Sequence, residues 1–212
     1  MKTKLLVLSA IFILATFTLQ AQMGFGILGG LNLQNLNGKD SNGDKLTNDM
    51  IIGFHAGINI QIPIVPQFYF QPGLLFTTKG AKNTNGTSIK LSYVELPLNV
   101  VYKALLGSGY FMLGFGPYVA YGIGGKVVPE SGTTSKITFK KSMESGDVDF
   151  TVYKPFDAGG NILIGYEMAG GIFLQLDAQL GMLNIWPENS SVLNNISTMK
   201  NTGFGLSLGY RF

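Results

Sequence analysis

The closing stretch Thr202-Gly-Phe-Gly-Leu-Ser-Leu-Gly-Tyr-Arg-Phe212 alternates between bulky apolar residues and small or polar ones. A period of two is typical of a β-strand, whose successive side chains point to opposite faces. One face of this strand would carry Phe204, Leu206 and Leu208, and the other would carry glycine, serine and arginine. The stretch therefore predicts a strand with one bulky apolar face and one face of small or polar groups.

The same sorting recurs in three upstream runs, at residues 52–61, 110–121 and 172–183. In each run one parity is large and apolar, while the other is mostly glycine or polar. The whole chain holds eight such runs, joined by connections of about 16, 5, 10, 5, 25, 5 and 17 residues. An even number of strands with alternately short and long connections is the pattern of a barrel inserted from one side of a membrane.

Whether the face with the large apolar side chains points into or out of the barrel distinguishes a soluble barrel from a membrane barrel. Eight strands enclose only enough space for side chains to fill, so glycine and polar groups suit the interior. The bulky face then points outward, which water would not tolerate but lipid requires. We therefore expect residues 22–212 to form an all-β, eight-stranded antiparallel up-and-down transmembrane β-barrel. Both termini would lie in the periplasm and four loops outside the cell.

The connections and the prolines refine this prediction. Pro72, Pro97 and Pro117 lie inside expected strands, where each removes a hydrogen-bond donor, so we expect bulges there or positions beyond the end of a shorter neighbouring strand. Segments 137–140 and 148–152 also alternate, which suggests a hairpin extension of the longest loop. The tight turns are expected at residues 63–66, 105–108 and 167–171, and the long hydrophilic connections at residues 37–49, 79–88, 126–149 and 187–201.

The first residues are typical of an export signal. Lys2 and Lys4 precede the apolar run Leu5–Leu19, and Ala21 offers a small residue for cleavage. The alternative, an uncleaved helical anchor, is disfavoured because the run falls short of the roughly 20 residues that span a bilayer. We expect residues 1–21 to be a cleaved signal peptide.

Composition excludes several classes of function. Removing the two lysines of the leader lowers the formal net charge from +3 to +1 (3 − 2), so the basic pI indicates no nucleic-acid partner. The chain has no cysteine, which excludes disulfides, thiolate metal sites, a cysteine nucleophile and a lipid-anchored form. Only 13% of the residues are charged and 29 are glycine, unlike an ordinary soluble helical domain.

Several segments together carry a resemblance to a known family. The pattern resembles the PorT-like family of outer-membrane β-barrels. The resemblance implies an eight-stranded barrel, and it implies that Phe212 is a signal read by the outer-membrane assembly machinery. It also leaves open a role as a secretion-system accessory. The segments that carry it are Gly26–Asn32, Gly53–Gly57, Phe70–Gly80, Tyr93–Leu98, Gly114–Pro117 and Gly203–Phe212.

Polar residues of the inward parity form the candidate site. Buried charges are costly unless they pair, so we interpret this set as a polar plug of the lumen. The alternatives are a proton or ion path and a hydrolase site at the single histidine. We expect His55, Glu95 and Asp177 near mid-strand and Asp157, Glu167 and Arg211 towards strand ends, with Asn99 in the same set.

Two glycine- or aspartate-rich strings match binding motifs only in part. Gly24-x-Gly26-x-x-Gly29 lacks the helix that a dinucleotide-binding turn requires after it. Asp40-Ser-Asn42-Gly-Asp44 resembles a calcium loop, but Lys45 and Ile51 replace the glycine and glutamate of that template. A solvated turn is the preferred interpretation of the second string, with a weak calcium contact as the alternative. We expect no cofactor, no metal and no catalytic residue.

The favoured function is that of a structural or interaction protein of the outer membrane, and not an enzyme. It would contact outer-membrane lipid and the assembly machinery. Its loops, chiefly residues 126–149, would bind a small ligand or an envelope protein. The alternatives are a narrow porin, a lumen or rim enzyme that needs His55, and a secretion accessory. The porin is disfavoured because eight strands leave almost no water channel.

Overall fold

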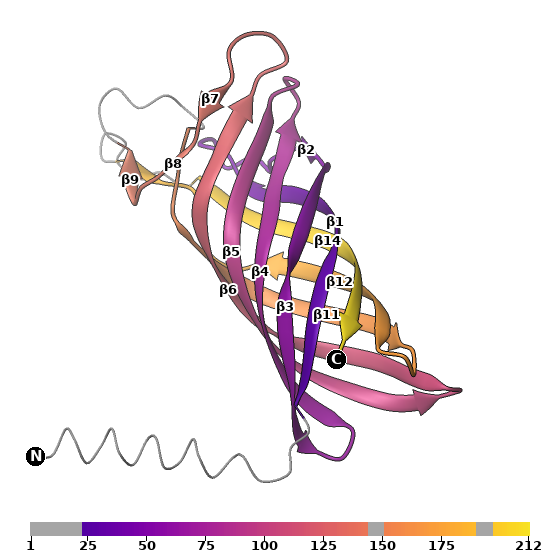
Figure 1. The fold of residues 1–212 in the computed structure, drawn as a ribbon. Coiled ribbons are helices and arrows are strands. Elements are labelled where there is room, and N and C mark those ends of the chain that lie inside the picture. The colour runs from indigo at the N-terminus through magenta and orange to yellow at the C-terminus, as the bar shows by residue number, and fades with distance from the viewer. Residues whose placement is uncertain (1–22, 144–150, 190–196) are drawn as a thin grey trace, which may run out of the picture.

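The computed structural model describes residues 23–143, 151–189 and 197–212. Within these residues eight long strands close into one barrel (Figure 1). Each strand pairs antiparallel with its neighbours along the chain, and the last pairs with the first, which confirms the predicted fold class. The barrel strands are β1 (Gly24–Lys39), β3 (Ile51–Val65), β4 (Phe68–Asn83), β5 (Ser88–Leu106), β6 (Gly109–Val128), β11 (Phe156–Glu167), β12 (Ile172–Gly181) and β14 (Thr198–Arg211).

Six two-residue strands lie in the connections. They are β2 (Asn48–Asp49), β7 (Ser135–Lys136), β8 (Thr138–Phe139), β9 (Ser142–Met143), β10 (Val152–Tyr153) and β13 (Glu188–Asn189). The described residues include no helix of the length and apolarity needed to cross a membrane.

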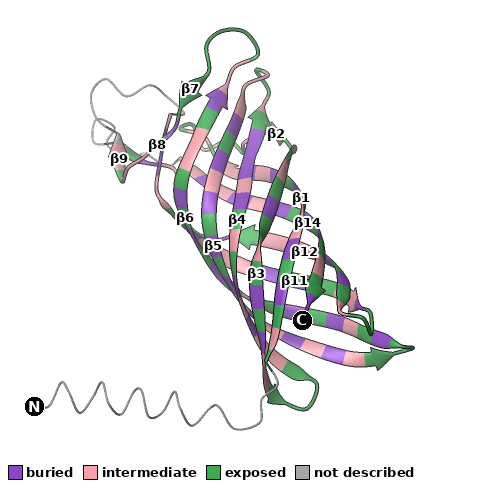
Figure 2. Ribbon diagram, viewed as in Figure 1, coloured by how far each residue is buried: buried purple, intermediate pink, exposed green. Residues whose placement is uncertain are grey.

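The alternation of the sequence reappears as alternating exposure along every strand (Figure 2). On β14 the side chains of Phe204, Leu206 and Leu208 are 53%, 47% and 60% exposed, whereas Ser207 is fully buried. The bulky parity therefore faces outward, as predicted. Glycine on the inward parity also permits close strand approach: a Cβ added to Gly30 would lie 1.9 Å from the carbonyl oxygen of Leu206.

Exposed aromatic side chains gather near both ends of the barrel. Towards the loop end, the rings of Tyr121 and Phe156 meet edge to face at 5.1 Å. Towards the turn end, Phe68 and Tyr102 are 5.1 Å apart, and Phe212 packs against the neighbouring Tyr210. Two such aromatic girdles mark the interfaces of a membrane barrel.

The turns at one end of the barrel are as short as predicted. β3 and β4 are joined by Pro66 and Gln67, the latter with a φ of 70°. The expected long connection at residues 79–88 is wrong, because β4 continues to Asn83 and only residues 84–87 form the turn. The charged residues of this segment predict a loop, but the backbone of Lys79 and Lys82 pairs with β5. Lys79 consequently lies inside a strand.

The three strand prolines do not sit at bulges. Pairing is interrupted beside each of them, but the register is the same on both sides of the interruption. The register shifts lie elsewhere, between Pro63 and Val65 and between Ser92 and Tyr93. The cross-strand partners of Pro72, Pro97 and Pro117 are Leu98, Tyr118 and Gly160.

Within the described residues, the two alternating segments of the longest connection do not pair as the predicted hairpin. β8 and β10 pair in parallel, with Thr138 opposite Val152 and Phe139 opposite Tyr153. A hairpin would require antiparallel pairing. The rest of the predicted second arm, including Val148, lies outside the described residues.

Candidate functional site in the barrel lumen

An ion cluster lies inside the barrel towards its loop end. Lys79 Nζ lies 2.8 Å from Glu95 Oε2 and 3.1 Å from Asp157 Oδ2. The three side chains are essentially inaccessible to solvent. Tyr118 and Asn201 donate further hydrogen bonds to Asp157 Oδ2, at 3.3 and 2.9 Å. Two carboxylates and one ammonium give this cluster a formal charge of −1.

A second ion cluster lies towards the turn end. Lys103 Nζ is 2.6 Å from Glu167 Oε1, and Arg211 Nε is 2.8 Å from Glu167 Oε2. Arg211 Nη1 donates to Asn59 Oδ1 at 2.8 Å, and Lys103 Nζ donates to Gln61 Oε1 at 3.2 Å. Two cations share one carboxylate, so the formal charge here is +1. Every ion of this cluster thus has a hydrogen-bonding partner, which burial of charge requires.

His55 lies between the two clusters and contacts neither. Its Nδ1 is 2.5 Å from Asn32 Oδ1, and its Nε2 is 2.7 Å from Ser207 Oγ. Asn32 Nδ2 in turn donates to Thr77 Oγ1 at 3.0 Å. The sequence offered no Ser-His-Asp arrangement, yet the fold places a serine, a histidine and an asparagine in the order and at the distances of a nucleophile, a base and an orienting group.

The space beside this histidine is too small for hydrolysis of a lipid or peptide. The polar cavity that it lines with Asn99, Glu95 and Asp177 has a volume of about 40 Å³. That is room for one or two water molecules, and not for an acyl chain. Ser207 is fully buried. The geometry therefore fits a hydrogen-bonded plug better than a substrate site.

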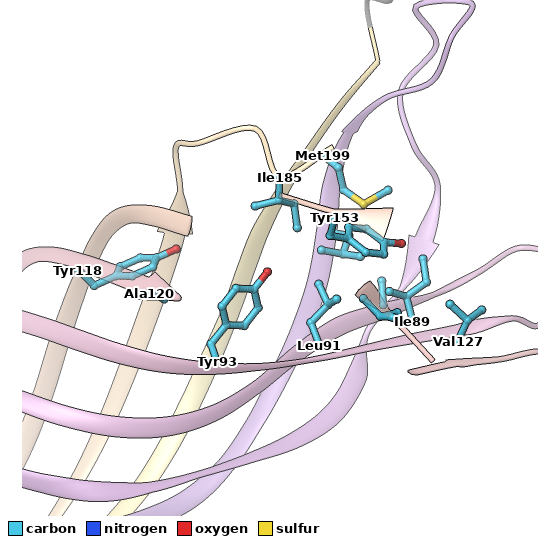
Figure 3. Packing of buried hydrophobic residues seen from close by; sticks show 12 residues of the cluster. Ile89, Leu91, Tyr93, Tyr118, Ala120, Val127, Tyr153, Ile185 and Met199 are labelled. Carbon is cyan, nitrogen blue, oxygen red and sulfur yellow. The ribbon is translucent and has the colours of Figure 1, made fainter. Parts of the chain in front are cut away.

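An apolar cluster, here called the cap, lies at the loop end of the barrel interior (Figure 3). Tyr153 and Ile185, from two connections, pack against Leu91 and Tyr93 of the barrel wall and against Met199. Burial raises the pKa of the Tyr153 phenol above its usual value of 10.0. The expectation of a lumen lined only by small and polar groups is thus wrong at this end.

A smaller apolar cluster also lies inside the barrel nearer the turns. It contains Leu28, Val101, Met112, Leu163 and Phe173. The guanidinium carbon of Arg211 lies 5.1 Å from the Phe173 ring centre. Large apolar side chains therefore also point into the barrel interior, beside the ion clusters.

All seven predicted residues line the interior, but they divide between separate networks. Glu167 and Arg211 meet directly, and Glu95 and Asp157 meet through Lys79. His55 has its own network, while Asn99 and Asp177 border the small cavity.

The main partners that sequence reasoning missed are Lys79, Lys103, Asn32 and Ser207. For the two lysines, the alternation of the sequence did indicate an inward position. Lys79 continues the inward parity of Gln71 and Thr77, and Lys103 continues that of Glu95 and Asn99.

The motif strings have local structural explanations. Gly24, Gly26 and Gly29 all lie within β1, so no helix follows this string as a dinucleotide site would require. Asp40 Oδ1 accepts hydrogen bonds from the backbone N–H groups of Asn42 and Asp44, at 2.9 and 3.0 Å. This is the geometry of a self-capped turn.

A closed eight-stranded barrel with an apolar outside and buried ion pairs inside defines a small integral membrane barrel. A family model described as "Outer membrane protein beta-barrel domain" matches residues 20–186, and the chain belongs to this family. It is an outer-membrane protein that crosses the bilayer with its strands. The narrower PorT-like assignment stays a prediction.

Two solved structures illustrate what the chain is similar to. The first is Ail, the attachment invasion locus protein of Yersinia pestis, in complex with the heparin analogue sucrose octasulfate. It is 11% identical over 90% of this chain and 99% of that chain, with a TM-score of 0.43. The second is Neisserial surface protein A (NspA), 14% identical over 89% and 97%, with a TM-score of 0.46. Among curated proteins, no match to the chain was found.

Proposed function

We propose that this protein is a closed outer-membrane barrel that acts through its external loops as a structural and binding protein. The observation that supports this proposal is that buried side chains and ion pairs lie inside the barrel at successive levels. The cap lies at the loop end, and below it the ion clusters around Lys79 and Lys103 link strands that are not neighbours in the sheet, β4 to β11 and β5 to β11. A diffusing ion or solute would have to break buried ion pairs to pass.

Conductance in planar lipid bilayers tests the proposal. We expect the refolded protein to show no steady unitary current. A triple variant, Lys103→Ala, Glu167→Ala and Arg211→Ala, should also stay closed, because the cap and the Lys79 cluster remain. An open porin in the same membrane is the positive control. Steady, large unitary currents through the wild-type protein would overturn the closed-lumen proposal and favour the narrow porin.

The loop contribution is tested separately by capture of neighbouring proteins. The segment 126–149 is the longest connection expected from sequence, and part of it reaches the cap through Ile137. We expect intact cells to yield a cross-linked envelope partner that disappears when residues 129–136 are replaced by a short Gly-Ser turn. These residues lie before the segment that contributes to the cap. An unchanged set of cross-linked proteins would count against loop-mediated binding.

Two further points belong to the proposal. Cleavage after Ala21 concerns residues outside the described range, and amino-terminal sequencing of the mature protein should begin at Gln22. The resemblance to the PorT-like family supports a test for a secretion accessory. Deletion of the gene should then impair cargo export without removing other outer-membrane barrels.

A further inference from the structure

A row of lysines crosses the outside of the barrel wall. Lys90 of β5 stands directly opposite Lys126 of β6, and Lys126 stands directly opposite Lys136 of β7. All three residues are exposed. In the described part of the chain, none of them forms an ion pair with a carboxylate.

Such a row is unfavourable without a counter-charge. Residues directly opposite each other in an antiparallel pair have Cβ atoms about 5 Å apart, and like charges at that distance oppose pairing. Lys154, which is partly exposed, lies by contrast 3.1 Å from Glu188. Within the described residues the row therefore has no counter-charge, and an anionic group bound there would relieve the repulsion.

The outward-facing side chains change in character from the middle of the membrane towards the lysine row. The outward residues of β5 run from Val94 through Ser92 to Lys90, from the membrane towards the loops. β4 repeats the first two steps with Phe76 and Thr78. Apolar, hydroxyl and cationic groups thus follow one another in the order in which a phospholipid presents acyl chains, ester linkages and phosphate.

The wall is hollowed at the same place. A depression of about 500 Å³ is lined on its apolar side by Leu31, Ile52 and Phe54 and on its polar side by Thr78, Lys90 and Lys126. Leu31 and Ile52 are 62% and 71% exposed. Lipid-facing side chains that border a concave surface offer an acyl chain more contact than a convex barrel wall does.

An interruption between β3 and β4 accompanies the depression. Regular pairing of these strands stops at His55 and Thr77, and β4 next pairs with β2 at Asp49 and Lys82. The Thr78 hydroxyl bridges the gap: it accepts from the Phe54 N–H at 2.7 Å and donates to the Phe54 carbonyl at 3.1 Å. Backbone groups at membrane depth need such partners. The Phe54 backbone therefore keeps a donor and an acceptor where the strand pairing is interrupted.

We propose that this surface binds a phosphate-bearing lipid of the outer leaflet. The acyl chains lie against Leu31, Ile52 and Phe54, and the phosphate lies between Lys90 and Lys126. The site is on the wall, where the apolar part of the ligand stays in the bilayer, and this location favours a lipid over a soluble anion. The proposal does not depend on a closed lumen or on the loops.

Native mass spectrometry of the refolded protein, released from detergent micelles, tests the proposal. The probe is diphosphoryl lipid A, with phosphatidylcholine as the neutral comparison. We expect the wild-type barrel to retain one lipid A molecule in preference to phosphatidylcholine. The double variant Lys90→Gln, Lys126→Gln should bind roughly 30-fold more weakly, at about fivefold for each lysine near an anionic lipid.

A control variant distinguishes binding at this site from non-specific attraction of lipid A to any exposed lysine. Lys45→Gln removes an exposed lysine of an external turn and should leave lipid A binding unchanged. Heat-modifiable migration on gels confirms that each variant is folded. Equal binding by the double variant and the wild type would overturn the proposal, as would an equal loss in Lys45→Gln. Full displacement by millimolar inorganic phosphate would also overturn it, because the site would then recognise a free anion.

Discussion

Replacing Lys79 by methionine tests whether the buried ion cluster holds the barrel together. At an effective dielectric constant of about 20, the 2.8 Å contact with Glu95 and the 3.1 Å contact with Asp157 correspond to gross attractions of about 6 and about 5 kcal/mol. Most of this attraction offsets the cost of removing three charges from water. The variant loses the attraction but still buries two carboxylates 0–1% exposed. We expect a loss of about 4 kcal/mol, within the range for breaking a buried pair.

The assay is equilibrium unfolding in guanidinium chloride from lipid vesicles, followed by the fluorescence of the single tryptophan, Trp186. Lys82→Met is the matched control, because Lys82 lies on the same strand and is exposed; it should change stability by under about 0.5 kcal/mol. Adding Glu95→Gln and Asp157→Asn to Lys79→Met should recover most of the loss, since no unpaired charge remains. A loss below about 1 kcal/mol in Lys79→Met, or an equal loss in Lys82→Met, would refute the reasoning.

Three further outcomes are expected. Because burial raises the pKa of Tyr153, its neutral form stabilises the cap fully below pH 10.0, and this contribution is lost as pH rises above that value. The emission of Trp186, whose ring lies 6.4 Å from that of Tyr153, should therefore change in alkali in the wild type and not in Tyr153→Phe. Gly116→Ala should cost about 1–3 kcal/mol in unfolding experiments, because the new Cβ would lie 2.1 Å from a backbone carbonyl, whereas Gly124→Ala has open space and should be nearly neutral. Phe212→Ala should lower the amount of folded barrel recovered from cells while leaving refolding into vesicles unchanged, and equal losses in both assays would argue against Phe212 as an assembly signal.

The strands and their facing were predictable because both depend on local alternation. Phe204 and Leu206 face lipid for a reason visible within three residues of sequence. The residue at which a strand ends depends less on the neighbouring residues in the sequence and more on contacts with other strands. A charged residue beside glycine predicts a loop at Lys79, and only its ion-pair partners Glu95 and Asp157 show why it is buried.

The cap could not be predicted from the sequence, because it also depends on contacts between distant segments. Leu91 and Tyr93 share the inward parity with Glu95, and their bulk contradicts a small, polar lumen unless something covers it. The covering groups, Tyr153 and Ile185, come from two connections far along the chain. Nothing local pairs these segments, so their meeting could not be predicted from periodicity.

The seam between the first and last strands has a consequence for biogenesis. β1 and β14 pair along their length, from Gly26 opposite Arg211 to Lys39 opposite Thr198. Contacts between residues so distant in sequence form late, because the intervening chain must be ordered first. The barrel therefore cannot close until β14 has been synthesised and delivered, and until then the unpaired edge of β1 is open to pairing with another chain.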